Sequence, residues 1–325
     1  MTNAPHPLAR GYALFALLGA GLLLALLVSL GFGSAEHATS DIVLQIRLPR
    51  AVLAAVVGAG LATAGALLQA LLQNPLADPY VLGISGGAAV GGVIALAFGW
   101  DAGIGSVSVP LVAFLGALAA TVLLWAIAGG AGAAPSHSLL LTGIVFNAFA
   151  SSLIIFVITA ADLSQVAGVF LWLIGSIRLV DTWLIGAVAC FLALGLGIGL
   201  YHAYALNLLS QGDETAAHLG VEVAKVRRWI LLGTALMIGA SVAVSGLIGF
   251  VGLIVPHLLR LLIGSDHRVL VPASALFGAA FLMTADTLAR TLLAPTELPV
   301  GALTSLVGGP LFLLLLRREL RGMSR

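Results

Sequence analysis

The sequence predicts an all-α, polytopic membrane protein with about ten transmembrane helices. Apolar residues make up 61% of the 325 residues, against about 45–50% in soluble proteins, and only 8% are charged, against about 25%. The mean hydropathy is +1.16. So few charges cannot supply a water-facing surface all round, which excludes a soluble globular protein. At roughly 20 residues per span, ten spans leave only short loops. We therefore predict a single transmembrane domain over residues 1–325.

Ten continuous apolar runs, separated by clusters of polar and turn residues, are the candidate spans. Open sheets cannot cross lipid, so each run is predicted to be a helix. In chain order the runs cover about 11–30, 51–70, 81–99, 110–128, 139–160, 183–201, 229–245, 247–263, 269–289 and 300–316.

The basic residues predict that both chain termini are cytoplasmic. With that orientation ten Lys and Arg residues fall inside and four outside, as the positive-inside rule requires. The inner ten are Arg10, Lys225, Arg227, Arg228, Arg260, Arg268, Arg317, Arg318, Arg321 and Arg325, and the outer four are Arg47, Arg50, Arg178 and Arg290.

Two connections are longer than turns. Residues 161–181 lie outside and are too short and too polar at their ends to span, so we expect a re-entrant or interfacial helix there. Residues 202–228 form the long cytoplasmic loop. Within it, Asp213, Glu214 and Thr215 are typical of a helix start, and Gly220 is typical of a helix stop. The loop is therefore predicted to carry a short surface helix.

The polar residues argue against chemistry within the chain. There is no GxxxxGK[ST] loop to bind ATP and no HExxH motif, and we find no catalytic residues, no metal site and no cofactor requirement. The single cysteine, Cys190, excludes an intrachain disulfide, and the scattered basic residues give no nucleic-acid patch. Energy must then arrive from a partner, for which the charged surface helix is the obvious docking point.

The alternative to a membrane protein powered by a partner is an ion-coupled secondary transporter. Such carriers usually need ionisable groups at mid-membrane. The nearest candidate, Asp286, lies one turn before Arg290, and an i,i+4 ion pair near the outer helix end is the simpler account.

Several polar residues keep two interpretations. Arg47 and Arg50 flank Pro49 and are expected to project at the outer surface, toward lipid phosphates or toward an acidic patch of a partner. Arg178 would meet a carboxylate or a lipid headgroup. On the fifth span, polar side chains either line a path or pack helices together, and they are Thr142, Asn147, Ser151 and Ser152.

Three segments resemble the FecCD family, the permease subunits of type II ABC importers. They are RLPRAVLAAVVGAGLATAGALLQALLQNPLADPYVLGISGGAAVG (47–91), GDETAAHLGVEVAKVRR (212–228), and the blocks SGLIGFVGLIVPHLLRLLIGSDHRVLVP and TLARTLLAPTELPVGALTSLVGGPLF within 245–312. The resemblance implies a type II ABC importer permease fold in the inner membrane. It also implies a homodimer that passes an iron–siderophore, haem or cobalamin along its axis by alternating access, and it does not distinguish these cargos.

The resemblance further implies three sets of contact residues. Two cytoplasmic ABC ATPase subunits, which hydrolyse the ATP, would grip Glu214, Ala217, Leu219 and Gly220. A periplasmic substrate-binding protein would dock on Arg47, Arg50 and Arg290. A cytoplasmic gate would include Asn74, Leu76, Ser136 and His137.

Overall fold

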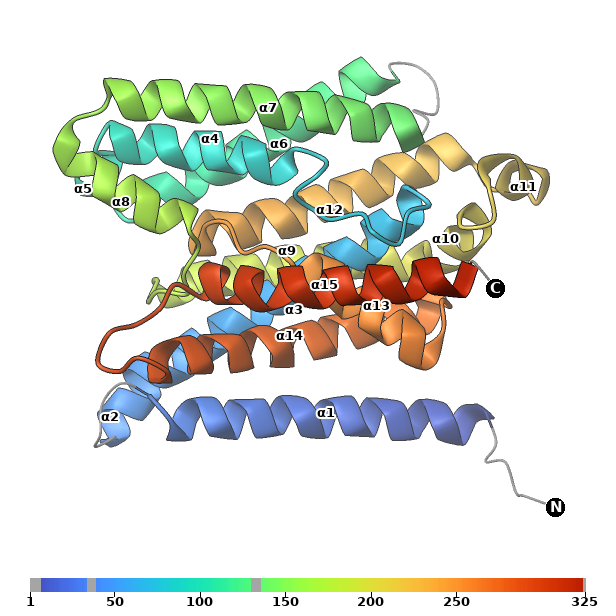
Figure 1. The fold of residues 1–325 in the computed structure, drawn as a ribbon, viewed down its shortest axis with the longest axis horizontal. Helices are drawn as coiled ribbons and strands as arrows, with labels where there is room; N and C mark the ends of the chain where they lie inside the picture. Colours follow the sequence, from blue (N-terminus) through green and yellow to red (C-terminus); the bar gives the residue numbers. More distant parts are fainter. Residues whose placement is uncertain (1–6, 34–38, 104, 130–135, 324–325) are drawn as a thin grey trace.

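The computed structural model describes residues 7–33, 39–103, 105–129 and 136–323, and within these ranges the chain is helical with short connections (Figure 1). A helix occupies each of the ten apolar runs, which confirms the all-α prediction. Seven helices are long and apolar enough to cross a bilayer. The eight longest helices are α1 (Pro7–Gly31), α3 (Leu48–Leu71), α6 (Ser108–Ala128), α7 (Ser136–Ala160), α9 (Thr182–Tyr201), α12 (Val223–Ser245), α14 (His267–Thr291) and α15 (Val300–Met323).

Two of the expected spans are only partly helical. The runs at 81–99 and 247–263 contain α4 (Ile84–Ala97) and α13 (Val251–Ile263), of 14 and 13 residues, or about 20 Å each at 1.5 Å per residue. Proline at positions 75 and 79 delays the start of α4. Before α13 the chain takes positive φ at Gly246 and Phe250, which ends α12 and keeps 246–250 out of a helix.

Six short helices make up the connections. They are α2 (Ser40–Ile42), η1 (Val43–Arg47), α5 (Trp100–Gly103), α8 (Leu163–Leu173), α10 (Ala203–Leu209) and α11 (Asp213–His218). The α8 helix forms the first half of 161–181, and residues 174–181 are not helical. The start at Asp213 and the stop at Gly220 confirm the predicted surface helix, although α12 begins at Val223, six residues earlier than expected.

Glycine allows the central helices to approach closely. The α3 helix packs against α14 where Gly58 meets Gly278, and α4 packs against α6 where Gly87 meets Gly116. A Cβ at any of these glycines would collide with the facing helix, so these contacts require glycine. The α3 and α12 helices are consequently the most buried spans, whereas α1 and α7 lie at the periphery.

The bundle has two ends that matter for function. The α11 end holds α10, α11, the N-terminal end of α1 and the C-terminal end of α15 (Figure 1). The α5 end, opposite, holds α2, α5, α8 and the α14–α15 connection (Figure 1). Both described chain ends therefore lie on one side of the bundle.

Candidate functional site

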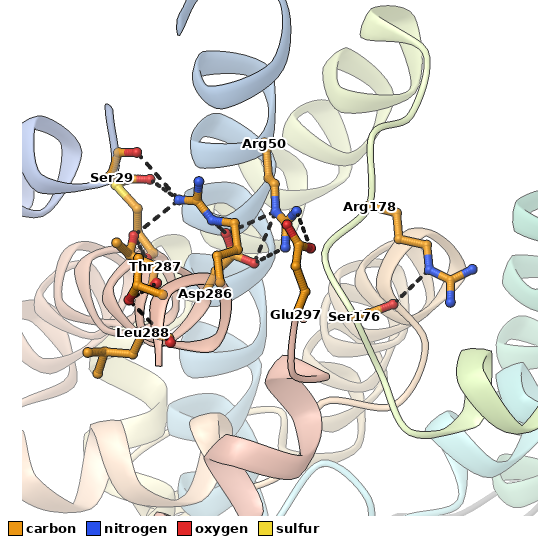
Figure 2. A network of polar contacts seen from close by, with 11 residues as sticks. Ser29, Arg50, Ser176, Arg178, Asp286, Thr287, Leu288 and Glu297 are labelled. Atoms are coloured by element: carbon orange, nitrogen blue, oxygen red, sulfur yellow. Dashed lines mark hydrogen bonds and ion pairs between the residues drawn. The ribbon is translucent and has the colours of Figure 1, made fainter. Parts of the chain in front are cut away.

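The strongest polar cluster of the α5 end is centred on Asp286. Arg50 Nη2 lies 2.9 Å from Asp286 Oδ1, and Arg290 Nε lies 3.1 Å from Asp286 Oδ2. Arg50 Nη1 also pairs with Glu297 Oε2 at 2.8 Å (Figure 2). The pair between Asp286 and Arg290 is the one that their spacing predicts, and Arg50 from α3 joins it as a second cation.

Two of the three arginines expected to dock a binding protein are buried. Arg47 is 3% exposed, and its Nη1 donates to the carbonyl oxygens of Leu30 and Gly31 at 2.8 and 3.0 Å. The expectation that the Arg47 guanidinium projects from the surface is therefore wrong. The last carbonyls of α1 have no partner within their own helix, and Arg47 supplies one. Arg290 is likewise buried and donates to Ser29 Oγ at 3.0 Å.

The exposed charges of the α5 end are mostly acidic. Arg50 is half-buried, and Arg178 is exposed, with its Nε donating to Ser176 Oγ at 3.0 Å. Figure 2 shows Arg178 apart from the Asp286 cluster. Among the described residues, five carboxylates are exposed at this end: Asp41, Asp101, Asp162, Asp181 and Glu297. A partner that docks here meets accessible arginine only at Arg50 and Arg178 within the described residues.

The α11 helix presents a free face at the other end. Ala216 is buried, whereas Glu214, Ala217, Leu219 and Gly220 are all exposed, with Leu219 61% accessible. Gly220 has φ +86°, and Val221 N and Gly220 N donate to the carbonyls of Ala216 and Ala217. This is a Schellman ending, in which glycine takes the left-handed position. An apolar residue fixed on a short exposed helix suits contact with a partner.

The four residues expected at the gate lie at the α11 end, on two neighbouring segments. Asn74 Oδ1 accepts a hydrogen bond from Leu76 N at 2.9 Å, which closes a tight turn after α3. Ser136, the first residue of α7, donates to Leu71 O at 3.2 Å and so joins α7 to the end of α3. His137 is exposed beside it.

Some polar residues of α7 hold neighbouring segments in place, and others lie on an open face that could line a path. Asn147 Nδ2 donates to Tyr80 O at 2.6 Å and so holds the irregular segment before α4. Ser152 Oγ donates to Ala148 O within its own helix. Ser151 is exposed, and Thr142 lies in an apolar groove between α6 and α7. Asn147 thus joins α7 to the segment before α4, whereas Ser151 and Ser152 lie on an open face.

An open pocket of about 430 Å³ forms where the irregular segments meet. Its lining residues are Asp78, Tyr80, Leu173, Ile174, Leu247, Gly249, Phe250, Gly301, Ala302 and Ser305. In this pocket Asp78 Oδ1 accepts a hydrogen bond from Tyr80 N at 2.8 Å. Sequence reasoning missed this pocket, and the two prolines flanking Asp78 were the only local signal of an irregular segment.

Comparison with known proteins gives a consistent result. A family model described as the FecCD transport family matches residues 11–318. The hemin transport system permease protein HmuU of Yersinia pestis is 46% identical, over 92% of this chain and 95% of that protein. The cobalamin import system permease protein BtuC of Halobacterium salinarum is 42% identical, over 93% of this chain and 80% of that protein.

The fold is also found among solved structures. The structure of a metal-chelate type ABC transporter in an inward-facing conformation matches with a TM-score of 0.86 and 30% sequence identity. The match covers 94% of this chain and 99% of the solved chain. The similarity thus extends over nearly the whole length of both chains.

Proposed function

This chain belongs to the FecCD transport family, and from that premise we propose that it is the membrane permease of an ATP-driven importer for a large metal chelate. The family match over residues 11–318 carries the proposal. The proposed cargo is hemin, cobalamin or a ferric siderophore, because relatives named for hemin and cobalamin are 46% and 42% identical. Two copies of the chain would enclose the path, and alternating access would move the cargo along it.

We place the α11 end in the cytoplasm, where two ATPase subunits bind the exposed face of α11 within the loop of residues 202–228. The exposed face of α11 supports this assignment, with Glu214, Ala217, Leu219 and Gly220 as the contact residues. ATP hydrolysis then belongs to the partner subunits, in keeping with the absence of a phosphate-binding loop from the sequence. The protein would accordingly lie in the inner membrane.

A periplasmic binding protein is proposed to dock at the α5 end, where residues 161–181 form part of the rim. Arg50 is the member of the predicted docking set that reaches solvent, and a partner carboxylate would there compete with Glu297. Arg47 and Arg290 would act from inside the cluster, because both are buried. This division follows from their hydrogen bonds to the end of α1.

The gate is proposed at Asn74, Leu76, Ser136 and His137, where the turn after α3 meets the start of α7. The path would run past Ser151 and Ser152, with Thr142 nearer the α11 end. Asn147 would hold the segment before α4. Apolar lining residues, such as Leu247 and Phe250, suit weak binding of a bulky cargo, because a tight site would retain it.

The proposal is tested by ATP hydrolysis in proteoliposomes. The permease is reconstituted with its ATPase and binding protein, and hemin, cobalamin and a ferric siderophore are supplied separately. Stimulation by one cargo is expected, and it should disappear when the phosphate-loop lysine of the ATPase is replaced. Uptake driven by an ion gradient without ATPase would instead establish a secondary transporter and refute the proposal.

A further inference from the structure

Asp213, the first residue of α11, holds together several elements of the bundle. Its Oδ2 lies 2.7 Å from Arg227 Nη2 on α12, and its Oδ1 accepts a hydrogen bond from Gln73 Nε2 at 2.9 Å. Gln73 follows the end of α3 and also donates to Leu209 O, at the end of α10, at 2.9 Å. One carboxylate therefore connects α11 with α3 and α12, and through Gln73 with α10.

Arg227 extends this connection to α7. Its Nη2 donates to Ser136 Oγ at 2.9 Å, and Ser136 Oγ in turn donates to Leu71 O at 3.2 Å. We call Asp213, Arg227, Gln73 and Ser136 the Asp213 joint. Through the joint, a six-residue surface helix is bonded to the ends of the two spans that border the proposed gate.

Burial distinguishes the Asp213 joint from ordinary surface ion pairs. Arg227 is 1% exposed, so moving Asp213 away would take a carboxylate from a guanidinium that lies in the interior. The pair formed by Glu222 and Lys225 at the same end is open to solvent, with 3.7 Å between the charged atoms, and has little effect. Gln73 has φ +50°, a conformation that non-glycine residues rarely adopt, and this backbone is kept where its side chain reaches Asp213.

The rest of α11 is attached more loosely. Among the described helices it packs chiefly on α10 and α12, and most of its side chains are exposed. A displacement of α11 can therefore reach α3 and α7 through the polar bonds of the joint, beside the packing of Ala216 in the core. Because Asp213 bonds to both Gln73 and Arg227, α11 and the ends of these spans should move together.

We propose that Asp213 and Arg227 are positioning residues that transmit displacement of α11 to the ends of α3 and α7. The inference rests on the proposed function, because it assumes that ATPase subunits displace α11. It adds the specific link between that helix and the proposed gate. Neither residue needs to touch the cargo or ATP.

The first experiment measures cargo moved per ATP hydrolysed in the reconstituted complex, using hemin, cobalamin or a ferric siderophore, whichever stimulates the wild type. For Asp213→Asn we expect normal ATPase association and ATP hydrolysis, with cargo per ATP at least about fivefold lower. Arg227→Lys keeps the charge and should therefore retain more of the wild-type cargo per ATP than Arg227→Gln. The matched control is Glu222→Gln, which removes an exposed carboxylate at the same end and should leave the ratio unchanged. An unchanged ratio in Asp213→Asn would overturn the proposal.

A second experiment is independent of cargo and ATPase. In a Cys190→Ser background, spin labels at Ala217 and Leu76 report the distance between α11 and the turn after α3 in the purified permease in nanodiscs. The link predicts a narrow distance distribution that broadens in Asp213→Asn and not in Glu222→Gln. An unbroadened distribution refutes the link even if the transporter proves to be an importer. If no cargo stimulates the wild-type complex, the proposed function fails, and the label distances alone decide the link.

Discussion

At the residue scale, the main lesson concerns charged side chains that remain inside an apolar bundle. Asp286 is 1% exposed and is tolerated because Arg50 and Arg290 both pair with it. Buried charges gain little net stability when they are paired, but they are costly when one partner is lost. The arrangement is therefore interdependent, and each member keeps the others in place.

Asp286→Asn should destabilise the protein more than any exposed charge change at the same end. It leaves two largely buried guanidinium groups without their shared carboxylate, which typically costs about 3–5 kcal/mol. Thermal unfolding in detergent measures the effect. The control is Glu297→Gln, whose carboxylate is exposed and whose loss should cost under about 1 kcal/mol. Equal effects of the two substitutions would contradict the assigned roles.

At the element scale, short helices and irregular segments carry the proposed functions, and long spans hold them in place. The α4 and α13 helices begin inside the protein after non-helical segments, which is tolerated in a membrane only where protein surrounds the backbone or a cavity lies beside it. Such a segment before each helix contributes to the same pocket, through Asp78 and through Leu247. The shortened helices thus create space that two full spans would fill.

Gly220→Ala tests whether the left-handed ending of α11 contributes to ATPase binding. The φ of +86° costs an alanine about 1–2 kcal/mol, although open space surrounds the position. We expect ATPase binding to the permease to weaken by up to about tenfold, measured as an affinity in detergent. Gly186→Ala is the control, because it also adds a methyl group to open space, but on α9 and without a positive φ. Unchanged binding in Gly220→Ala would show that the left-handed ending is dispensable for docking.

At the scale of the whole molecule, the two ends differ in character. The α11 end exposes a short helix with an apolar residue, whereas the α5 end exposes carboxylates around a few arginines. Large apolar side chains also remain exposed along peripheral helices, among them Phe149 and Phe156 on α7. In a membrane these side chains meet lipid or a second copy of the chain, and the proposed dimer uses part of this surface.

A crosslinking experiment tests the dimer and the gate together. In a Cys190→Ser background, Leu76→Cys should form a covalent dimer whose yield changes when nucleotide binds the ATPase subunits, because we propose that the gate lies next to the dimer axis. Tyr201→Cys is the control, as it is strongly exposed at the same end but lies on α9. If Leu76→Cys forms no dimer in any nucleotide state, this residue does not belong to a gate at the axis.

The sequence by itself determined the helical class, the ten apolar runs and the boundaries of the surface helix. These features depend on local composition and spacing, as at Asp213 and Gly220, where adjacent residues alone mark the helix start and stop. The pairing of Asp286 with Arg290 was accessible for the same reason, since one helical turn separates them.

Only the tertiary structure decided which charges are buried and which elements share a contact. Arg47 and Arg50 flank the same proline. Arg47 nevertheless donates to a carbonyl at the end of α1, whereas Arg50 pairs with Asp286, 236 residues away in the sequence. The Asp213 joint likewise gathers residues from four separate segments. Burial and hydrogen bonding depend on neighbours brought together by helix packing, and no local pattern in the sequence encodes them.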